Sequence, residues 1–334
     1  MLEPNWILGL CHGAHDSACA LFRDGALVAF VEQERLSRVK HALGEAPVDA
    51  VEWCLGSQGL TLPDVRCVAL GSDHFALAEW LGPDTGEARE AIALEDPARL
   101  FPPAVFGDGP TPPVVRFRHH LAHAASAFWP SGFPEAAILV LDAMGEDASA
   151  IAAVGSGDTI EVVRAWPVDV SLGYFYEAAC EYVGFEWYDA GKLMGLAAYG
   201  RPTHAMPLVV RGSRLEWDGV ATSSARGRAL VRERREALLR RFEASSFPYE
   251  RGLREEIMAY ADFAASAQAA LSEAIVELAS DVRRETGIPR LAMAGGVALN
   301  CVANARIAAQ GPFERVWVQP AAGDSGTALG AALH

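Results

Sequence analysis

Two similar stretches decide the fold: ILGLCHGAHDSACALFRDGALVAFV at residues 7–31 and ILVLDAMGEDASAIAAVGSGDTIEVVRA at residues 138–165. Each has three apolar runs separated by two polar turns that contain Gly and Asp, which is the pattern of a β-meander. The expected strands are residues 7–10, 17–22, 26–31, 138–141, 148–154 and 160–165. Asp16 and Asp147 occupy matching positions in the first turn of each meander. The repeat therefore predicts a duplicated unit.

Each meander is followed by segments of helical periodicity, so the repeat predicts two related α/β lobes that face a cleft. We expect one domain, 1–334, with a first lobe of about 1–130 and a second of about 131–334. Folds of the ASKHA (actin/sugar-kinase/Hsp70-like) class are built in this way and hold a nucleotide between the lobes. The other expected elements are helices at 48–57, 122–127, 230–243, 255–273 and 273–285, a strand at 291–294, a short hairpin within 207–224 and an insertion or long loop at 72–115.

The composition is that of a folded, acidic protein. Hydrophobic residues make up 51% of the 334 residues, and the formal net charge is -15. Such a surface repels nucleic-acid backbones and acidic membranes, so neither is an expected partner. The six cysteines form no CxxC pair, the N-terminus lacks a basic signal region, and no apolar run reaches membrane-span length. We therefore expect a soluble, cytoplasmic protein with reduced cysteines.

The stretch RHHLAHA at residues 118–124 indicates a metal site. His119 and His123 are four residues apart and so share one face of a helix. Asp142 closes an apolar run, and Asp324 opens a helix after another. Two imidazoles and two carboxylates suit Fe(II), Mn(II) or Zn(II). The alternatives are a helix that carries histidines without a metal and, for Asp324, a helix N-cap.

His120 lies off the helix face that His119 and His123 share, so we expect it to contact substrate or to support a metal ligand. The order of residues is not HExxH, because residue 120 is His. The general base of a zinc protease is therefore missing.

Two further motifs combine glycine with polar groups. Gly295 and Gly296 follow the expected strand, and a helix that starts directly after them would present free N–H groups to a ligand, with Asn300 on its face. Lys192, near Gly195, lies in an apolar stretch without a Walker pattern and is expected to hold a phosphate or a developing oxyanion. The alternatives are a simple strand-to-helix turn and a surface lysine at a helix start.

The first turn of the chain carries His12, His15 and Asp16 and precedes a locally basic cluster. The cluster consists of Arg35, Arg38, Lys40 and His41. In an acidic protein, such a cluster could bind phosphate or a carboxylated substrate. The alternative is a solvated loop.

Six ordered motifs resemble the O-carbamoyltransferases of nodulation-factor and antibiotic biosynthesis, the nodulation/tobramycin/cephamycin carbamoyltransferase family. They are HDSA at 15–18, EQERLSRVKH at 32–41, HHLAHA at 119–124, GKLMGLA at 191–197, GGVALNCVAN at 295–304 and QPAAGD at 319–324. The resemblance covers nearly the whole chain. It implies a two-lobed ASKHA-type domain, similar to that of the tRNA threonylcarbamoyl transferases.

The resemblance also implies ligands. The implied metal ligands, typically of iron as Fe(II), are His119, His123, Asp142 and Asp324. Carbamoyl-adenylate, made from carbamoyl phosphate and ATP, would lie beside the metal. The expected adenylate contacts are Lys192, Gly195, Gly295, Gly296 and Asn300. His15 and its neighbours would lie near the acceptor hydroxyl.

The expected reaction is metal-assisted transfer of a carbamoyl group to a hydroxyl of a small-molecule natural product. His15, or less favourably His120, would take the hydroxyl proton, and Lys192 would stabilise the departing adenylate phosphate. Family members usually continue into a YrdC-like domain that makes carbamoyl-adenylate, whereas this chain ends at His334. We therefore expect an isolated transferase domain, a separate YrdC-like activating protein, or a fragment.

Two other functions fit parts of the pattern. A tRNA threonylcarbamoyl transferase would need a basic face for RNA, which the acidic balance disfavours. A nucleotide-binding, non-catalytic partner of a YrdC-like protein would bind nucleotide without turnover. The acceptor stays open: Trp187, Tyr188 and Trp217 could stack on a sugar-like molecule, with packing in the core as the alternative.

Overall fold

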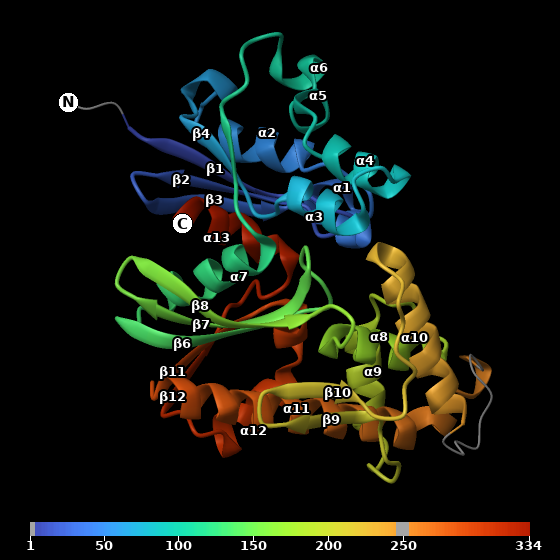
Figure 1. Cartoon of the computed structure of the whole chain (residues 1–334). Helices are drawn as coiled ribbons and strands as arrows, with labels where there is room; N and C mark the ends of the chain where they lie inside the picture. The colour runs from blue at the N-terminus through green and yellow to red at the C-terminus, as the bar shows by residue number, and fades with distance from the viewer. Residues whose placement is uncertain (1–3, 245–253) are drawn as a thin grey trace.

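Two five-stranded sheets of equivalent topology form the framework of the computed structural model, which describes residues 4–244 and 254–334 (Figure 1). The first sheet has the order β3-β2-β1-β4-β5, and the second β8-β7-β6-β11-β12. The strands of the first are β1 (Trp6–Cys11), β2 (Ala18–Arg23), β3 (Ala26–Glu32), β4 (Cys67–Leu70) and β5 (Val114–Arg116). Those of the second are β6 (Glu135–Leu141), β7 (Ala148–Ser156), β8 (Thr159–Pro167), β11 (Arg290–Ala294) and β12 (Arg315–Val318).

The duplicated meander is confirmed. In each sheet the first strand pairs antiparallel with the second and parallel with a later strand, as β1 does with β2 and β4, and β6 with β7 and β11. Equivalent registers join Gly9 to Ala20 and Val140 to Ile151. Strand β6 is buried over Ala136–Leu141, which explains why its sequence is continuously apolar rather than alternating.

The second lobe holds most of the helices predicted from periodicity. Its elements are α8 (Leu172–Val183), α9 (Ala190–Ala197), the hairpin β9 (Leu208–Arg211) and β10 (Arg214–Trp217), α10 (Gly227–Glu243), the 3-10 segment η4 (Arg254–Tyr260), α11 (Ala261–Thr286) and α12 (Cys301–Gln310). The helices expected on either side of Glu273 form one continuous helix, α11, because no breaker separates them. In the first lobe, α2 (Val48–Gly56) lies where predicted.

Of the two interpretations of residues 72–115, an insertion or a long loop, the long loop was wrong. This segment contains α3 (His74–Leu81), α4 (Gly86–Ala93), α5 (Pro97–Leu100), α6 (Pro103–Phe106) and β5. The side chains of Asp73, Thr85 and Asp96 each accept a backbone N–H at the start of a helix. Because the helices are short and three of them begin at their own N-cap residue, the intervening Pro and Gly residues gave the segment the composition of a loop.

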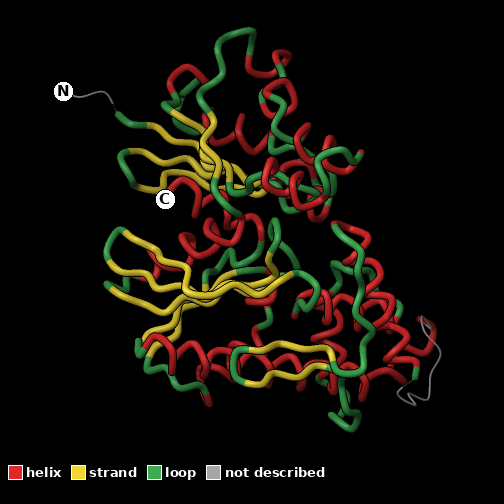
Figure 2. The backbone as a smooth tube through the Cα atoms, in the orientation of Figure 1, coloured by secondary structure: helices red, strands yellow, loops and turns green. Residues whose placement is uncertain are grey.

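Two helices lie back to back between the sheets (Figure 2). The helix α7 (His119–Phe128) follows the first lobe in the chain but packs on β6 and β11, whereas α13 (Thr327–Leu333) ends the chain and packs on β1 and β2. In the sequence, all strands of the first sheet precede residue 130 and all strands of the second follow it. The helices α7 and α13 cross this division, because α7 precedes residue 130 but packs on the second sheet, and α13 follows it but packs on the first.

None of the helices in the described ranges has both the length and the apolar character that a membrane crossing requires. All six cysteines are unpaired, and four of them are buried.

The approach of α13 to its neighbours requires glycine. A Cβ added to Gly330 would lie 1.7 Å from the carbonyl oxygen of Ala122, and one added to Gly9 would lie 1.9 Å from that of Ala328. Both clashes involve backbone atoms, so a rotamer change cannot relieve them.

We expect Gly330→Ala to lower the free energy of unfolding by at least about 1–3 kcal/mol, because the methyl group forces α7 and α13 apart. Urea unfolding followed by circular dichroism measures this. The control is Gly56→Ala at the end of α2, where an added Cβ meets no atom within 4 Å. Equal stability of the two variants would contradict the packing described here.

Candidate metal centre

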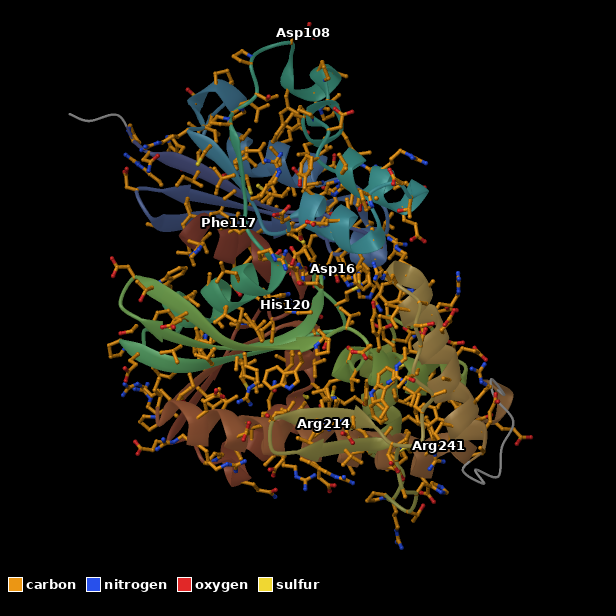
Figure 3. All side chains as sticks on the ribbon, viewed as in Figure 1. Asp16, Asp108, Phe117, His120, Arg214 and Arg241 are labelled. Atoms are coloured by element: carbon orange, nitrogen blue, oxygen red, sulfur yellow. The ribbon has the colours of Figure 1, made fainter. Side chains whose placement is uncertain are left out.

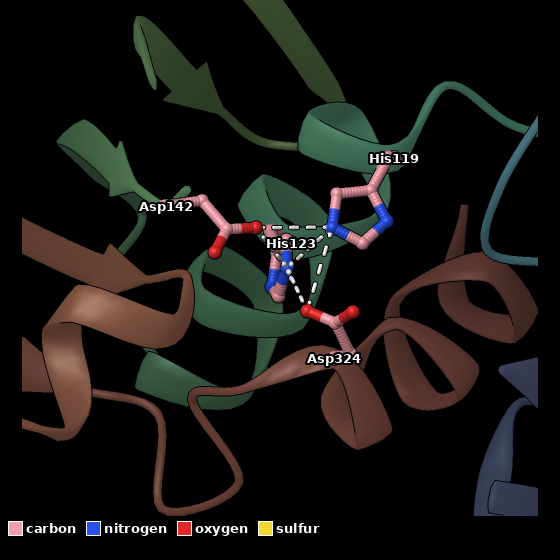
Figure 4. Close-up of side chains that lie close together, drawn as sticks. All are labelled: His119, His123, Asp142 and Asp324. Carbon is pink, nitrogen blue, oxygen red and sulfur yellow. Dashed lines mark hydrogen bonds and ion pairs between the residues drawn. The ribbon is translucent and has the colours of Figure 1, made fainter. Parts of the chain in front are cut away.

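Four side chains that are far apart in the sequence converge between the two sheets (Figure 4). They are His119 and His123 from α7, Asp142 from the end of β6, and Asp324 from the 3-10 turn η6 (Asp324–Gly326) before α13. One ligand atom from each lies within 4.8 Å of the other three. The predicted set of four is therefore brought together by the structure.

The separations suit a small cation. The Nε2 atom of His119 lies 3.1 Å from Oδ2 of Asp142 and 3.1 Å from Nε2 of His123. Oδ1 of Asp324 is 3.6 Å from the Nε2 atom of each histidine. Ligands on metal bonds of about 2.0–2.2 Å stand roughly 3.0–3.6 Å apart in octahedral or tetrahedral geometry. The donor set and its spacing therefore fit a divalent metal such as Fe(II), Mn(II) or Zn(II).

The paired glycines position Asp142. Its Oδ1 atom accepts hydrogen bonds from the backbone N–H groups of Ala143, at 2.8 Å, and Gly296, at 3.2 Å, so that Oδ2 faces the histidines. Gly295 has a φ of 93°, and a Cβ there would lie 2.2 Å from the carbonyl oxygen of Leu141. Gly295 therefore allows the end of β11 to lie close to the end of β6. From the sequence, this close approach was expected to be made to a ligand instead.

A buried glutamate that the sequence analysis did not single out holds the start of α7. Oε1 of Glu146 accepts the backbone N–H of His119 at 2.9 Å and that of Asp73 at 3.0 Å. Ser72 lies 3.3 Å from Nδ1 of His119. Nothing in the local sequence distinguishes Glu146 from its exposed neighbour Asp147, because only the tertiary structure buries it against a helix N-terminus.

The electrostatics of the cluster favour bound positive charge. Burial opposes ionisation of Asp142 and Asp324, yet the neighbouring histidines hold the pKa of both carboxyl groups below the usual range. Burial would lower the pKa of His119, but Asp324 and Asp142 outweigh it and raise that pKa well above its ordinary value. One buried and one partly buried carboxylate thus remain charged side by side, and a cation among them would compensate this charge.

His15 lies beside the cluster. Its Nδ1 atom is 2.9 Å from Oδ2 of Asp16 and 3.8 Å from Oδ2 of Asp324. Burial opposes its protonation, but Asp16 and Asp324 raise the pKa of His15 to about 9. The other oxygen of Asp16 contacts Nδ1 of His41 at 2.9 Å. Asp16 therefore connects His41 and His15 in a series of polar contacts that continues to Asp324.

The remaining histidine of the HHLAH motif lies elsewhere. His120 is buried against Gly145 on another face of α7 and is not part of the cavity lining (Figure 3). Burial and the neighbouring His119 lower the pKa of His120 to about 3. The His120 ring is therefore neutral at physiological pH and lies outside the cavity lining.

A cavity of about 920 Å³ opens from the cluster and is lined by both lobes. His15, Lys40 and His41 line it from the first lobe, whereas Arg35 of the basic cluster pairs with Glu32 outside it. Gly296 and Asn300 are part of the lining on the opposite side. The Asn300 amide, however, caps α12 and exchanges hydrogen bonds with Gln268, so its polar atoms already have partners.

Lys192 and Gly195 are not part of this lining, although Gly191 and Met194 of the same helix are. The Lys192 ammonium is more than half exposed and lies 2.8 Å from Oδ1 of Asp189. The structure therefore does not bring Lys192 to the metal cluster.

Of the aromatic residues considered for the acceptor, Trp187 and Tyr188 line the cavity. Their rings contact each other, and those of His15 and His41 respectively. Trp217 is instead buried in the core of the second lobe, with Arg234 over its ring. The core-packing alternative is therefore correct for Trp217.

The family model for the carbamoyltransferase N-terminus matches residues 6–83 and 108–333. The chain belongs to this family. The matched part contains both sheets and all four metal-type ligands, and the unmatched part contains α4, α5 and α6.

The relatives are longer proteins. The uncharacterized protein sll1178 of Synechocystis sp. is 35% identical over 98% of this chain and 56% of its own length. Nodulation protein NolNO of Sinorhizobium fredii is 35% identical over 96% of this chain and 46% of its own length. Nodulation protein U of Bradyrhizobium diazoefficiens is 27% identical over 95% of this chain. The chain thus spans about half the length of the curated relatives it matches.

Among solved structures, full-length HypF in the phosphate- and nucleotide-bound form matches with a TM-score of 0.56 at 15% identity. The match covers 98% of this chain and 55% of HypF. At this identity the likeness concerns the fold, and the predicted two-lobed ASKHA fold is confirmed.

Replacing Asp324 by Ala should abolish metal binding, because the variant lacks one of the two carboxylates that balance the cation. We expect affinity for Fe(II), Mn(II) and Zn(II) to fall by at least about 100-fold. Dialysis followed by elemental mass spectrometry measures the loss, with Asp158→Ala in the exposed β7–β8 turn as the control. Wild-type metal content in Asp324→Ala would exclude the proposed ligand set.

His12 makes stability sensitive to acid. It is 1% exposed, both ring nitrogens lack a hydrogen-bond partner within the described residues, and burial lowers its pKa to about 3. Because the unfolded chain binds the proton more readily, His12 costs no stability above its unfolded pKa, and stability falls as the pH drops below it.

Between about pH 7.5 and pH 5.5, this group should remove roughly 1.4 kcal/mol from the free energy of unfolding. In His12→Leu that part of the pH dependence should vanish. Urea unfolding at both pH values, on wild type and variant, measures the difference. Parallel pH profiles would show that His12 does not titrate in this way.

Proposed function

We propose that this chain transfers a carbamoyl group from carbamoyl-adenylate to a hydroxyl group of a small molecule, with a divalent metal held by His119, His123, Asp142 and Asp324. The observation that carries the proposal is the convergence of these four ligands at a cavity shared by both lobes, in a chain of the carbamoyltransferase N-terminal family. Nodulation proteins among the relatives agree with this chemistry.

The four ligands would hold Fe(II), the metal that the motif resemblance implies. A divalent ion there supplies Lewis-acid polarisation of a carbonyl or phosphate oxygen. Asp142 is kept in the orientation for this role by two backbone N–H groups, and His119 by Glu146 and Ser72. Rigid anchoring of this kind fixes the ligand atoms before the metal binds.

His15 is the residue that we propose accepts the proton of the attacking hydroxyl. It lines the cavity and lies 3.8 Å from a metal ligand, whereas His120 is outside the lining. Because Asp324 is one of three carboxylates that raise the pKa of His15, neutralising Asp324 favours the neutral imidazole that can accept a proton. Asp16 holds the ring through the contact of its carboxylate with Nδ1.

The adenylate is proposed to lie along the wall that contains Gly296 and Asn300, where the turn lets a ligand approach the backbone. Lys192 could stabilise the phosphate of the adenylate only if its ammonium group broke its ion pair with Asp189. Lys40 is already part of the cavity lining and carries the same charge. We therefore propose Lys40 as the cation that assists the departure of AMP, with Lys192 as a second.

The test is transfer from carbamoyl phosphate and ATP in the presence of a separate YrdC-like protein, with candidate alcohols analysed by mass spectrometry. Wild type should yield carbamoylated product, and His15→Gln should lose about 10²–10⁴-fold in kcat while keeping its metal, because proton removal is lost. Arg226→Gln, an exposed change outside the cavity lining, is the control.

Binding of AMP without carbamoyl transfer, when the YrdC-like protein is shown to form carbamoyl-adenylate, would favour the non-catalytic partner instead. Unchanged kcat in His15→Gln would remove His15 from the mechanism while leaving the transfer reaction intact.

A further inference from the structure

One wall of the cavity is formed by a row of arginines on α10. Arg228, Arg232 and Arg235 line the cavity, and their spacing of four and then three residues places them on one face of the helix. The helix packs on α8 of the second lobe, and its first residue, Gly227, lies against Leu81 at the end of α3 in the first lobe (Figure 1). The row therefore extends across the mouth between the two lobes.

The three arginines differ in their partners. Arg235 is bound to α8, with its guanidinium 2.9 Å from Glu181 and 3.7 Å from Glu177. Arg228 and Arg232 are exposed, and neither has an ion pair with a carboxylate in the described part of the chain. Like charges four residues apart on a helix repel each other, so an anion between these two guanidinium groups would relieve that repulsion.

The acidic side chains of the lining already have other partners. Asp142 and Asp324 belong to the candidate metal cluster, Asp16 contacts two histidines, Glu177 and Glu181 face Arg235, and Glu236 lies 3.6 Å from Arg240. In a chain with 43 acidic and 28 basic residues, the two arginines are therefore an excess of positive charge that no carboxylate of the described residues pairs with.

This excess lies apart from the wall assigned to the nucleotide. Gly296 and Asn300 belong to the segment between β11 and α12, whereas α10 lies beyond α8 on the far side of the second lobe (Figure 1). Trp187 and Tyr188, the partly buried aromatic pair of the lining, follow α8 in the chain. The arginines and these aromatic side chains thus belong to a part of the lining that the proposed nucleotide wall does not use.

We propose that Arg228 and Arg232 form a subsite for an anionic group, a carboxylate or a phosphate, of the acceptor alcohol. This inference rests on the proposed function, since it defines the chemical class of the acceptor. Guanidinium groups bind both anions through paired N–H donors, and Arg is favoured over Lys where such planar recognition is required.

The test measures binding to the full chain by calorimetry, with AMP present so that the nucleotide site is filled. The probes are two matched pairs: glucuronate with glucose, and glycerol phosphate with glycerol. Wild type should bind at least one anionic probe at least about tenfold more tightly than its neutral partner, since two partly solvated charge pairs contribute of this order. The pair that shows the preference distinguishes carboxylate from phosphate.

The double variant Arg228→Glu/Arg232→Glu should lose this preference. The matched control, Arg214→Glu/Arg226→Glu, makes the same change of net charge at exposed positions outside the lining and should keep it (Figure 3 labels Arg214). Should charge reversal disturb folding, judged by circular dichroism, Arg228→Gln/Arg232→Gln serves in its place.

Equal binding of both members in each pair, including no measurable binding by any of them, would overturn the inference. So would an anion preference that survives in the α10 variants. Carbamoyl transfer by the wild type without any preference for the anionic probes would leave the proposed function standing and remove only this subsite. A preference for anionic probes in a protein that shows no carbamoyl transfer would contradict the proposed function and leave only the anion subsite standing.

Discussion

Two carboxylates, the buried Asp142 and the partly buried Asp324, stand beside two imidazole rings, and their charge has to be balanced where water has little access. The pKa of His119 is raised and those of the two carboxyl groups are lowered, so that positive charge is favoured at this point. A divalent cation held by the four ligands would supply that charge. The rest of the site is organised around this balance.

The fold brings the ligands together by exchanging helices between its two halves. The helix α7 is covalently next to the first sheet but packs on the second, and α13 does the opposite. The two helices approach closely because Gly330 leaves room for the carbonyl group of Ala122, and Gly9 of β1 does the same for that of Ala328 in α13. A cation bound by α7, β6 and the turn before α13 therefore connects both sheets, so that binding at this point is linked to the relative position of the lobes.

The cavity that opens from the metal cluster has walls of different character. The turn at Gly296 offers backbone groups and a side chain that is already hydrogen-bonded, and this is the wall along which we propose that the donor nucleotide lies. The α10 wall offers long cationic side chains, which suit a variable second substrate. His15 lies between these walls and next to Asp324, where the two substrates would meet.

The sequence by itself determined the meanders, the amphipathic helices and the pairing of His119 with His123, because each depends on the period of a single strand or helix. The sequence also placed Asp142 and Asp324 in the candidate ligand set, because each follows an apolar run, and the motif resemblance implies the same four residues. The sequence did not predict the helices within residues 72–115, because these helices are short and their Pro and Gly residues give the segment the composition of a loop. Only the tertiary structure decided that Glu146 is buried, that Lys192 faces Asp189 and that Arg228 and Arg232 line a cavity. The physical reason is that burial and partnership depend on which segments pack together across the whole chain, and local periodicity carries no information about that.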